Sequence, residues 1–417
     1  MKQQTPISAK NFRNEYLTYK NGILHFGDSE MAIDSLLKDY DRPCFVYDLA
    51  LIDRRLGQLK STLLVDQKPF DIYYAMKANA HPDLLKSLKN LGAGVDVVSG
   101  GEIDCAMEAG FLPYQIVYSG VGKTQREIEK ALRLGIHQIN VESIPELERI
   151  GETSARLGRK AAVALRLNPN IDIKTHPYIA TGLHENKFGL EISALPAIEK
   201  VLKTHARSIE LVGISLHLGS MMLEFEGLRQ ALKLLRPVYE SLQQKYSSVC
   251  RFDIGGGLGI FYDSQEMNSE TKLLQEYAKI VEEELKGLKA EYQTEPGRWL
   301  VAHGGILISQ IQYVKETSHK TFYIIDSGMN HLVRPSLYGA HHGIYSLFEN
   351  ADRAQKSVDV VGPICESSDF FAKNRMLPEM KAGEFLIIAD TGAYGFSMSS
   401  RYNQHELAQE LCIRSNK

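Results

Sequence analysis

The stretch at positions 70–80 is Phe70-Asp71-Ile72-Tyr73-Tyr74-Ala75-Met76-Lys77-Ala78-Asn79-Ala80. Its first half is a short apolar run with two tyrosines, which predicts a buried strand that ends before Asn79 and Pro82. A helix pattern follows, with leucines on one stripe and Gly92 as its stop. Lys77 is therefore predicted to be the last residue of a strand that leads into a helix.

Lys77 allows two interpretations. Lysine is rarely buried without a reason, and a desolvated lysine has a lowered pKa that makes its amine a usable nucleophile. The functional interpretation is a lysine that forms a Schiff base. The alternative is a lysine whose ammonium group reaches solvent at the end of the strand. This stretch alone leaves both open.

Outward from this stretch, strand and helix patterns alternate from residue 71 to residue 300. Amphipathic helix patterns separate the strands, for instance at 125–134, 144–157 and 228–244. The alternation predicts a parallel sheet, and eight strands is the number that closes a (β/α)8 barrel. A doubly wound open sheet is the competing architecture. The predicted strands are 71–77, 94–99, 116–120, 138–143, 161–168, 211–217, 252–255 and 291–295.

After Val301 the sequence pattern changes to strands without helices between them, which indicates a mostly β domain. Near the amino terminus, residues 22–26 are one more strand candidate, and a helix-like segment then ends at Lys38. The strands predicted after Val301 are 306–317, 320–327, 357–362 and 384–390.

We therefore expect three parts. Residues 1–43 contribute a strand to the β domain, residues 44–300 form the barrel, and residues 301–417 form a C-terminal β domain. Residues 169–190, after the fifth strand, are expected to form a long lid or binding loop.

Composition narrows the function classes. The chain has 417 residues, of which 44% are hydrophobic and 24% charged, as in an ordinary globular protein. A net charge of −3 gives no reason to expect a nucleic-acid or membrane-surface partner, and no run of about 20 apolar residues predicts a membrane span. The five cysteines are scattered without a CxxC pair, which argues against structural zinc and disulfides and favours the cytoplasm.

The predicted strands end in polar and glycine residues, where a barrel would have its active site. In strand six, Gly213, Ser215 and His217 occupy alternate positions and so lie on the same face of the sheet. This small and polar face is expected to line the barrel interior. His217 is thus expected to point into a pocket, with a hydrogen-bonded core histidine as the alternative. The strand ends are SGGE at 99–102, SLHLGS at 215–220, GGGLG at 255–259 and EPGR at 295–298.

Two glycine motifs do not predict a nucleotide site. A dinucleotide motif that starts at Gly255 would need glycine at 260, but Ile260 is there. A P-loop that ends at Thr124 would need its first glycine at Val117. The glycine loop can still hold a phosphate through its backbone N–H groups, and loops after strands seven and eight are a common phosphate site in barrels.

A lysine amine, a phosphate loop and an acid together suit pyridoxal phosphate. Lys77 would bind the cofactor aldehyde, and Glu295 could keep the pyridine nitrogen protonated, which makes the ring a strong electron sink. An arginine in place of Glu295 would weaken the sink. The glutamate therefore favours decarboxylation over racemisation.

At this point the residues resemble the fold-III pyridoxal-phosphate-dependent decarboxylases, most closely the branch that acts on diaminopimelate. The matching stretches occur in the family's order and span nearly the whole chain. They are YAMKAN at 74–79, DVVSGGE at 96–102, GGGLG at 255–259, EPGR at 295–298, GMN at 328–330, RPSLY at 334–338, GPICES at 362–367 and GAYGFSMSS at 392–400.

The resemblance implies pyridoxal 5'-phosphate as cofactor and a barrel of the alanine-racemase type with a mostly β C-terminal domain. It implies that Lys77 is the cofactor lysine, that His217 stacks on the ring, and that Glu295 contacts the pyridine nitrogen. The residues implied at the phosphate and the rest of the ring are Ser220, Gly257, Gly297, Arg298 and Tyr394.

The resemblance also implies how the substrate binds. Arg298, Arg334 and Tyr338 would hold a substrate carboxylate, for which arginine forks are well suited, and Tyr394 would lie beside them. In a homodimer with shared active sites, Cys365 would donate a proton from the partner subunit. Glu366 would bind the distal ammonium group of the substrate from the same side.

The expected reaction is removal of the D-centre carboxylate of meso-diaminopimelate to give L-lysine and carbon dioxide. The rivals are a related decarboxylase for a basic amino acid or a carrier-bound glutamyl group, and a silent homologue that only binds cofactor or partners. The chain departs from the family at Ser215, where a second histidine is usual, and at Met221, where glutamine is common. It also departs after Asn403, where the family has an arginine- and proline-rich segment.

Overall fold

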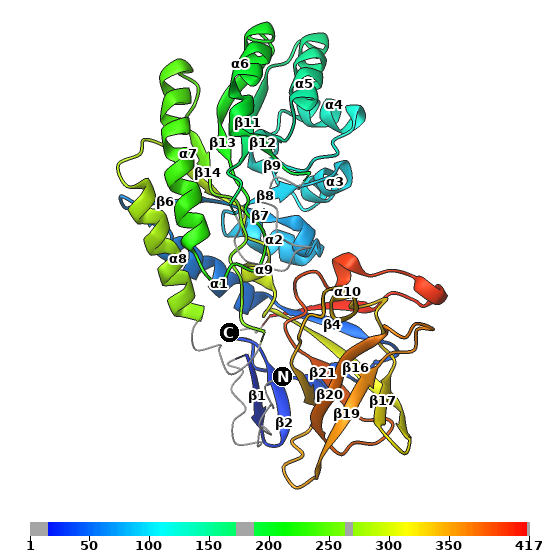
Figure 1. Cartoon of the computed structure of the whole chain (residues 1–417). Coiled ribbons are helices and arrows are strands. Elements are labelled where there is room, and N and C mark those ends of the chain that lie inside the picture. The colour runs from blue at the N-terminus through cyan, green and yellow to red at the C-terminus, as the bar shows by residue number, and fades with distance from the viewer. Residues whose placement is uncertain (1–15, 172–186, 263–269, 415–417) are drawn as a thin grey trace. The chain divides into compact units, whose positions relative to one another are not determined.

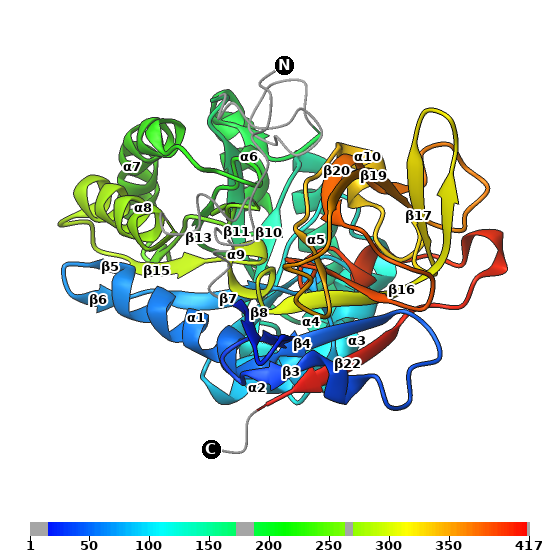
Figure 2. The same ribbon diagram turned by 90° about the horizontal axis from the view of Figure 1, so that it is seen from below.

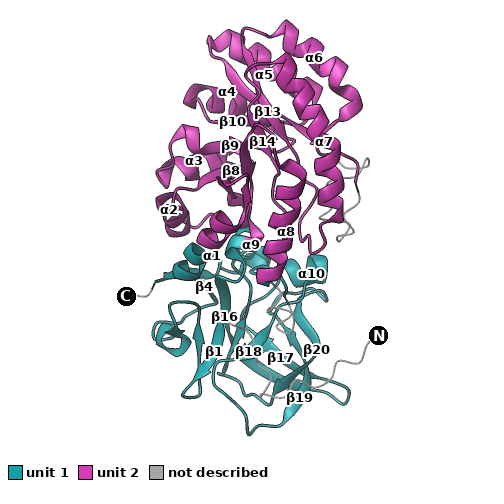
Figure 3. Cartoon of the chain, turned by 90° about the vertical axis from the view of Figure 1, so that its left-hand side faces the viewer, with its two compact units in different colours: residues 1–55, 260–270, 300–417 teal, residues 56–259, 271–299 magenta. Residues whose placement is uncertain are grey.

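The computed structural model of the chain describes residues 16–171, 187–262 and 270–414. The chain divides into two compact units, which Figure 3 shows in different colours. The barrel unit comprises residues 56–259 and 271–299. The β unit comprises residues 1–55, 260–270 and 300–417. The β unit is thus assembled from three segments that lie far apart in the sequence.

The barrel unit is built on eight parallel strands that close on themselves, with the short β12 (Leu190–Glu191) added beside the fifth (Figure 1). The ring closes where Thr294 of the last strand pairs with Ile72 of the first. The predicted barrel is confirmed, and the open sheet is excluded. The strands are β7 (Asp71–Ala75), β8 (Gly94–Val97), β9 (Ile116–Tyr118), β10 (Gln138–Val141), β11 (Ala161–Asn168), β13 (Ile209–Ser215), β14 (Arg251–Asp253) and β15 (Glu291–Thr294).

Helices alternate with the strands, and α4 to α7 lie outside them (Figure 1). Thr124 and Glu127 form a capping box at the start of α4, and Gly135, just past its end, has a left-handed φ of 70°. The helices predicted at 125–134 and 144–157 are confirmed, and the one predicted at 228–244 lies within α7. The helices are α2 (Pro82–Asn90), α3 (Gly100–Glu108), α4 (Gln125–Leu134), α5 (Ile144–Leu157), α6 (Leu195–Thr204), α7 (Glu226–Lys245) and α8 (Glu270–Leu285).

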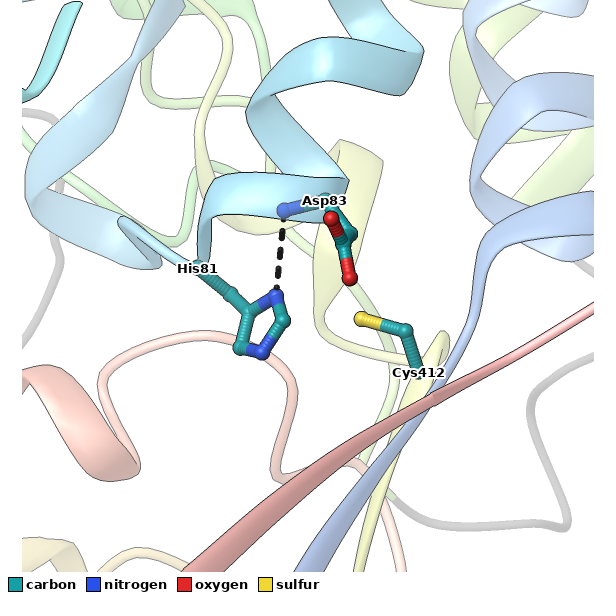
Figure 4. Close-up of side chains that lie close together, drawn as sticks. All are labelled: His81, Asp83 and Cys412. Carbon is teal, nitrogen blue, oxygen red and sulfur yellow. Dashed lines mark hydrogen bonds between the residues drawn. The ribbon is translucent and has the colours of Figure 1, made fainter. Parts of the chain in front are cut away.

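The helix after Lys77 starts at a histidine cap. The Nδ1 atom of His81 accepts the backbone N–H of Asp83 at 3.3 Å, and Pro82 occupies the first turn of α2, where its missing N–H is not needed (Figure 4). A sharp start of this kind fixes the length of the connection between β7 and α2. It therefore helps to hold Lys77 in place.

The β unit is organised around β16 (Gly305–Glu316). Ile306 and Ile308 belong to one apolar core and Leu307 to a second one, so the first half of β16 is buried on both faces. This explains its unbroken apolar sequence. The strand β4 (Cys44–Asp48) pairs antiparallel with β16 and parallel with β22 (Gln409–Ile413) (Figure 2).

The remaining strands complete an eight-stranded sheet and a small three-stranded one. The prediction of a mostly β region after Val301 is confirmed, but one short helix, α10 (Arg334–Tyr338), interrupts it. The helix-like segment before Lys38 is a single 3-10 turn at Ile33–Leu36. The other strands are β17 (Thr321–Ile325), β18 (Ile344–Ser346), β19 (Gln355–Val361), β20 (Phe370–Pro378) and β21 (Phe385–Ile388), with β1 (Leu17–Lys20), β2 (Ile23–Phe26) and β3 (Met31–Ala32) in the small sheet.

The remaining strands and α-helices are the hairpin of β5 (Leu64–Val65) and β6 (Lys68–Pro69), and the helices α1 (Leu49–Thr62) and α9 (Arg298–Val301). None of the helices in the described part of the chain is both long and apolar enough to cross a membrane. Residues 172–186 of the loop expected at 169–190 lie outside the described residues.

Candidate active site

Lys77 lies in one turn of 3-10 helix, Met76–Ala78, directly after β7. Its Nζ atom is 3.3 Å from Oδ2 of Asp96 on the neighbouring strand β8. The Lys77 side chain is 36% exposed, whereas that of Asp96 is fully buried. The amine is therefore accessible at the end of the strand, and a buried carboxylate holds it there.

Gly297 lets the loop after β15 pack against the Lys77 turn. A Cβ atom at Gly297 would lie 3.2 Å from Cβ of Ala75 and 3.3 Å from Cβ of Ala78, closer than ordinary contact. The backbone N–H of Ala75 also donates to the carbonyl oxygen of Pro296 at 3.0 Å. The loop that carries Glu295 and the turn that carries Lys77 thus form one packed edge.

Glu295 is a buried carboxyl group at the end of β15. Its Oε1 atom accepts hydrogen bonds from Nδ2 of Asn140 at 2.9 Å and from Oγ of Ser119 at 3.3 Å. Burial, and then the neighbouring Asp253 and Asp96, raise the pKa of Glu295 well above its usual range. A buried acid of this kind is suited to exchange a proton with a basic ring nitrogen.

His217 follows β13 and contacts the glycine loop. The backbone N–H of Gly256 donates to Nδ1 of His217 at 3.2 Å, so Nδ1 is an acceptor and the ring proton is on Nε2. Burial, and then the charges of Arg166 and Lys77, lower the pKa of His217 well below its usual value. The imidazole is therefore neutral, and its ring can stack on a flat ligand without repelling a protonated ring nitrogen.

The glycine loop fits only residues without a side chain. A Cβ atom at Gly255 would lie 2.1 Å from the carbonyl oxygen of Leu216, and one at Gly256 would lie 2.1 Å from that of Glu295. At Gly257 the clash would be with the carbonyl oxygen of Gly219 at 2.2 Å, and its φ of 106° is also unfavourable for other residues. The loop therefore brings bare backbone close to the ends of β13 and β15.

Next to this loop, the Arg298 guanidinium donates to Oγ of Ser220 through Nε at 3.3 Å and through Nη2 at 3.1 Å. Ser220 follows Gly219, which contacts Gly257, so arginine, hydroxyl and glycine backbone meet at one end of the site. Met221, one of the departures from the family, has a left-handed φ of 67° beside them. The group offers hydrogen-bond donors of the kind that bind a phosphate.

In the β unit, Arg334 is buried at the start of α10. Its Nη1 atom donates to Nε2 of His342 at 2.8 Å, and Nδ1 of His342 lies 2.8 Å from the carbonyl oxygen of Ala389. An arginine can only donate, so Nε2 of His342 accepts and Nδ1 carries the proton. The guanidinium also stacks on the ring of Tyr262, with 4.7 Å to its centroid. His342 and Tyr262 thus help to orient the Arg334 guanidinium.

Cys365 and Glu366 lie on an exposed loop of the β unit. The Asn403 side chain accepts the backbone N–H of Cys365 at 3.0 Å, and the Tyr402 hydroxyl donates to the Glu366 carboxylate. Asp369 closes the other end of the loop by accepting the N–H of Ile364 at 2.6 Å. The loop is therefore well held although its two functional candidates face outward.

The predicted site residues form two groups, one in each unit. In the β unit, Tyr338 and Tyr394 are half-buried, and Tyr394 has a left-handed φ of 56°. Arg334, Cys365 and Glu366 belong to the same unit. The barrel unit brings together Lys77, His217, Ser220, Gly257, Glu295, Gly297 and Arg298.

Several polar residues at the ends of barrel strands were not predicted. Asp96 lies on β8, Asn140 lies on β10, and Arg166 on β11 pairs with Glu142 at 2.7 Å. Asp253 ends β14 beside Glu295. A signal was present, because each is a polar residue in the second half of a short strand, near the end where barrels place their chemistry.

The residues of the barrel unit fit pyridoxal phosphate. The glycine loop, in which a Cβ atom would fall within 2.2 Å of backbone oxygens, brings backbone without side chains close to Ser220 and Arg298. Lys77 supplies an amine for an aldehyde, and Glu295 supplies a buried acid for a pyridine nitrogen. A phosphorylated pyridine aldehyde needs these three kinds of group.

Comparison with known proteins gives the same assignment. Residues 49–302 match the family model described as pyridoxal-dependent decarboxylase, pyridoxal binding domain. The chain is 40% identical to a diaminopimelate decarboxylase of Aquifex aeolicus over 96% of this chain and 93% of that relative. It is 42% identical to one from Helicobacter pylori over 92% of this chain and 93% of that relative.

Solved structures are also similar. A crystal structure of the Helicobacter pylori enzyme complexed with L-lysine has a TM-score of 0.86 and 40% identity, and it covers 91% of this chain and 94% of that chain. A lysine decarboxylase from Selenomonas ruminantium has a TM-score of 0.81 at only 21% identity, with 94% of this chain and 97% of that chain covered. At that identity the likeness concerns the fold.

Proposed function

Because the chain belongs to the pyridoxal-dependent decarboxylase family, we propose that it removes the D-centre carboxylate of meso-diaminopimelate to give L-lysine and carbon dioxide. The observation that carries the chemistry is the convergence of Lys77, His217 and Glu295 at the carboxyl ends of barrel strands. The substrate assignment is supported by relatives of about 40% identity that are named diaminopimelate decarboxylase. The protein is a carboxy-lyase.

In the barrel unit, each residue has a role in holding the cofactor. Lys77 would provide the amine that binds it, and Asp96 orients this amine. His217, as a neutral imidazole, would contact the ring, and Ser220, Gly257 and Arg298 would hold the phosphate. When bound, pyridoxal phosphate supplies an electron sink for the electron pair left behind by carbon dioxide. Glu295 strengthens that sink by keeping a proton at the pyridine nitrogen.

In the β unit, Arg334 and Tyr338 bind the distal carboxylate of the substrate, and Tyr394 lies with them in the substrate site. Support comes from the geometry of Arg334, whose guanidinium donates to the neutral His342 and stacks on the ring of Tyr262. A guanidinium fork held in this way has the geometry that suits a carboxylate. This favours diaminopimelate over lysine and ornithine, which lack a distal carboxylate.

Cys365 donates the proton that replaces the lost carboxylate, and Glu366 binds the distal ammonium group. We propose that both act on the active site of the partner subunit in a homodimer, which is consistent with their exposure in the isolated chain. We also propose a cytoplasmic location, because the five cysteines are all free. The domain limits expected from the sequence, 1–43, 44–300 and 301–417, stay a proposal, and they differ from the compact units in that residues 44–55 and 260–270 belong to the β unit.

A panel of amino acids tests the proposed function. The protein, supplied with pyridoxal phosphate, is incubated separately with meso-diaminopimelate, lysine, ornithine and arginine, and carbon dioxide release is measured. We expect release from meso-diaminopimelate only, with one lysine formed per carbon dioxide. Comparable release from lysine or ornithine would move the basic amino-acid decarboxylases ahead of this proposal.

A further inference from the structure

His303 joins two carboxylates of the β unit that come from different segments of the chain. Its Nε2 atom lies 2.5 Å from Oε1 of Glu270, and its Nδ1 atom lies 2.5 Å from Oδ1 of Asp390. An ionised carboxylate can only accept hydrogen bonds, so both ring nitrogens of His303 donate and the imidazole is positively charged. All three residues are buried. His303 therefore fixes the separation of Glu270 and Asp390.

Glu270 extends this contact towards Tyr262. Its Oε1 atom also accepts the backbone N–H of Phe261 at 3.1 Å, and Tyr262 is the next residue in the chain. The Arg334 guanidinium stacks on the ring of Tyr262, with 4.7 Å from its central carbon to the ring centroid. Glu270 thus holds the backbone segment whose tyrosine ring contacts Arg334.

Asp390 extends the contact in the other direction, towards His342. The residue before Asp390 is Ala389, whose carbonyl oxygen accepts the Nδ1–H of His342 at 2.8 Å. Nε2 of His342 in turn accepts a hydrogen bond from Nη1 of Arg334 at 2.8 Å. The rings of Tyr262 and His342 also meet edge to face, with their centroids 5.2 Å apart. The tyrosine and the imidazole that contact Arg334 are therefore both linked to the same buried cluster.

Two routes of contact thus lead from His303 to the Arg334 guanidinium. One passes through Glu270 and the other through Asp390. A shift of either carboxylate moves a group that orients the guanidinium. Pairing of a guanidinium fork with a carboxylate depends on orientation, and a misplacement of about 1 Å can cost on the order of a hundredfold in rate. A fixed separation of the two carboxylates is therefore a condition for a well-oriented arginine.

We propose that His303 is a positioning residue for the substrate carboxylate site, because it holds the segments that carry Tyr262 and His342 where they orient Arg334. His303 does not touch the substrate and acts through Arg334. The inference rests on the proposed function, in which Arg334 binds the distal carboxylate of the substrate. It gives the buried histidine a role in substrate binding in addition to its role in the β unit core.

The first test is the kinetics of His303→Gln, which removes the cation between the two carboxylates. The full chain is supplied with pyridoxal phosphate and assayed with meso-diaminopimelate at a temperature at which the variant is folded. We expect a higher KM with little change in kcat, so that kcat/KM falls about tenfold. The visible absorbance of the bound cofactor should equal that of the parent. A kcat/KM equal to that of the parent would overturn the inference.

The decisive comparison repeats this change in the Arg334→Ala background. A residue that acts through Arg334 has nothing left to position there, so His303→Gln should now lower kcat/KM less than about twofold. A purely structural role would lower kcat/KM by the same factor in both backgrounds, and that result would overturn the inference while leaving the proposed function standing. If the parent releases no carbon dioxide from meso-diaminopimelate, the proposed function fails and the inference falls with it.

His319→Gln is the matched control, because it makes the same change at an exposed histidine of the β unit. It should leave kcat/KM unchanged in both backgrounds.

Asp390→Gly decides the matter if His303→Gln does not fold. This change removes one carboxylate and leaves His303 paired with Glu270, and glycine suits the left-handed φ of 60° at position 390. It should lower kcat/KM about threefold or more in the parent and less than about twofold in Arg334→Ala. Losses of the same size in both backgrounds, or no loss in either, would overturn the inference.

Discussion

Two buried charge clusters, one in each unit, differ in the signs of the neighbouring groups. In the β unit, His303 lies between Glu270 and Asp390, with 2.5 Å from each ring nitrogen to a carboxylate oxygen. Arg55 pairs with the same Glu270 at 3.0 Å. Opposite charges therefore alternate there. In the barrel unit, Asp253 and Glu295 place two acids side by side.

Groups that are buried to a similar degree in the two clusters thus have pKa values shifted in opposite senses. Burial alone would lower the pKa of His303, but Glu270 and Asp390 outweigh it and raise that pKa to about 9. Burial would likewise raise the pKa of Glu270, but His303 and Arg55 outweigh it and lower the value to about 2. For Asp253, burial raises the pKa to about 6. The first cluster favours the charged forms of its members, whereas the second favours the neutral form of a carboxyl group.

The largest effect is expected for Lys77→Ala. The change removes the amine that binds the cofactor, so turnover should fall by about 10³-fold or more and the visible absorbance of lysine-bound cofactor should vanish. Lys86→Ala, at an exposed lysine of α2, is the control and should keep both. An unchanged absorbance band in Lys77→Ala would contradict the assignment of Lys77 as the residue that binds the cofactor.

His303→Gln changes the charge cluster of the β unit. It leaves Glu270 and Asp390 buried without their common cation, which should cost about 3–5 kcal/mol and lower the midpoint of thermal unfolding. His319→Gln, at an exposed histidine, should leave the midpoint unchanged. Near-parent stability for His303→Gln would mean that the cluster does not support the fold.

The pH dependence of stability sharpens that contrast. Because the folded-state pKa of His303 is raised to about 9 from 6.5, its contribution is complete below about pH 6.5 and is lost as pH rises through 9. Because the pKa of Glu270 is lowered to about 2 from 4.5, its contribution is complete above about pH 4.5 and is lost as pH falls through 2. As the pH rises from about 6 to about 9.5, the midpoint of thermal unfolding should therefore fall in the parent protein, and it should change less in His303→Gln.

Arg334→Ala should have a smaller and more selective effect. Loss of one partner of a desolvated charged contact costs on the order of 2–5 kcal/mol, so kcat/KM for meso-diaminopimelate should fall by at least about thirtyfold. Cofactor binding should be intact because Lys77 is unchanged. Arg353→Ala, which removes a surface arginine of the same unit, is the control. Equal losses for diaminopimelate and lysine would contradict the assignment of Arg334 to the distal carboxylate.

The smallest signal is expected from mixed subunits. If Cys365 acts on the partner's site, Lys77→Ala and Cys365→Ala chains, each inactive alone, should regain activity after subunit exchange. Half of the dimers would be mixed and one of their two sites intact, so about one quarter of parent activity is expected. Verified exchange without recovery would place Cys365 and Lys77 in a site formed by a single chain.

The fold of the barrel could be predicted because its signals are local. Short apolar strands alternate with amphipathic helices that have strong caps, such as Thr124 with Glu127. In the β unit, β20 was missed because Lys373, Asn374 and Arg375 interrupt its pattern and Asn374 has a left-handed φ of 51°. The parallel edge strand β22 was missed because its pairing with β4 joins residues that lie far apart in the sequence.

The candidate site was predictable where a motif or a strand end marked a residue, as for Lys77, His217 and Glu295. The partners of these residues were not, because a contact such as Asn140 with Glu295 depends on how strands are placed around the barrel. His342 was missed for the same reason, since its contact with Arg334 depends on the chain path after α10. Sequence patterns mark reactive groups, but the groups that set their charge come from tertiary structure.

The central claim is most directly tested with meso-diaminopimelate that carries ¹³C in the carboxylate of its D-centre. We predict that the label leaves entirely as carbon dioxide, that one unlabelled L-lysine forms per carbon dioxide, and that release requires pyridoxal phosphate. Label retained in lysine, or no release from diaminopimelate while another amino acid is decarboxylated, would contradict the account.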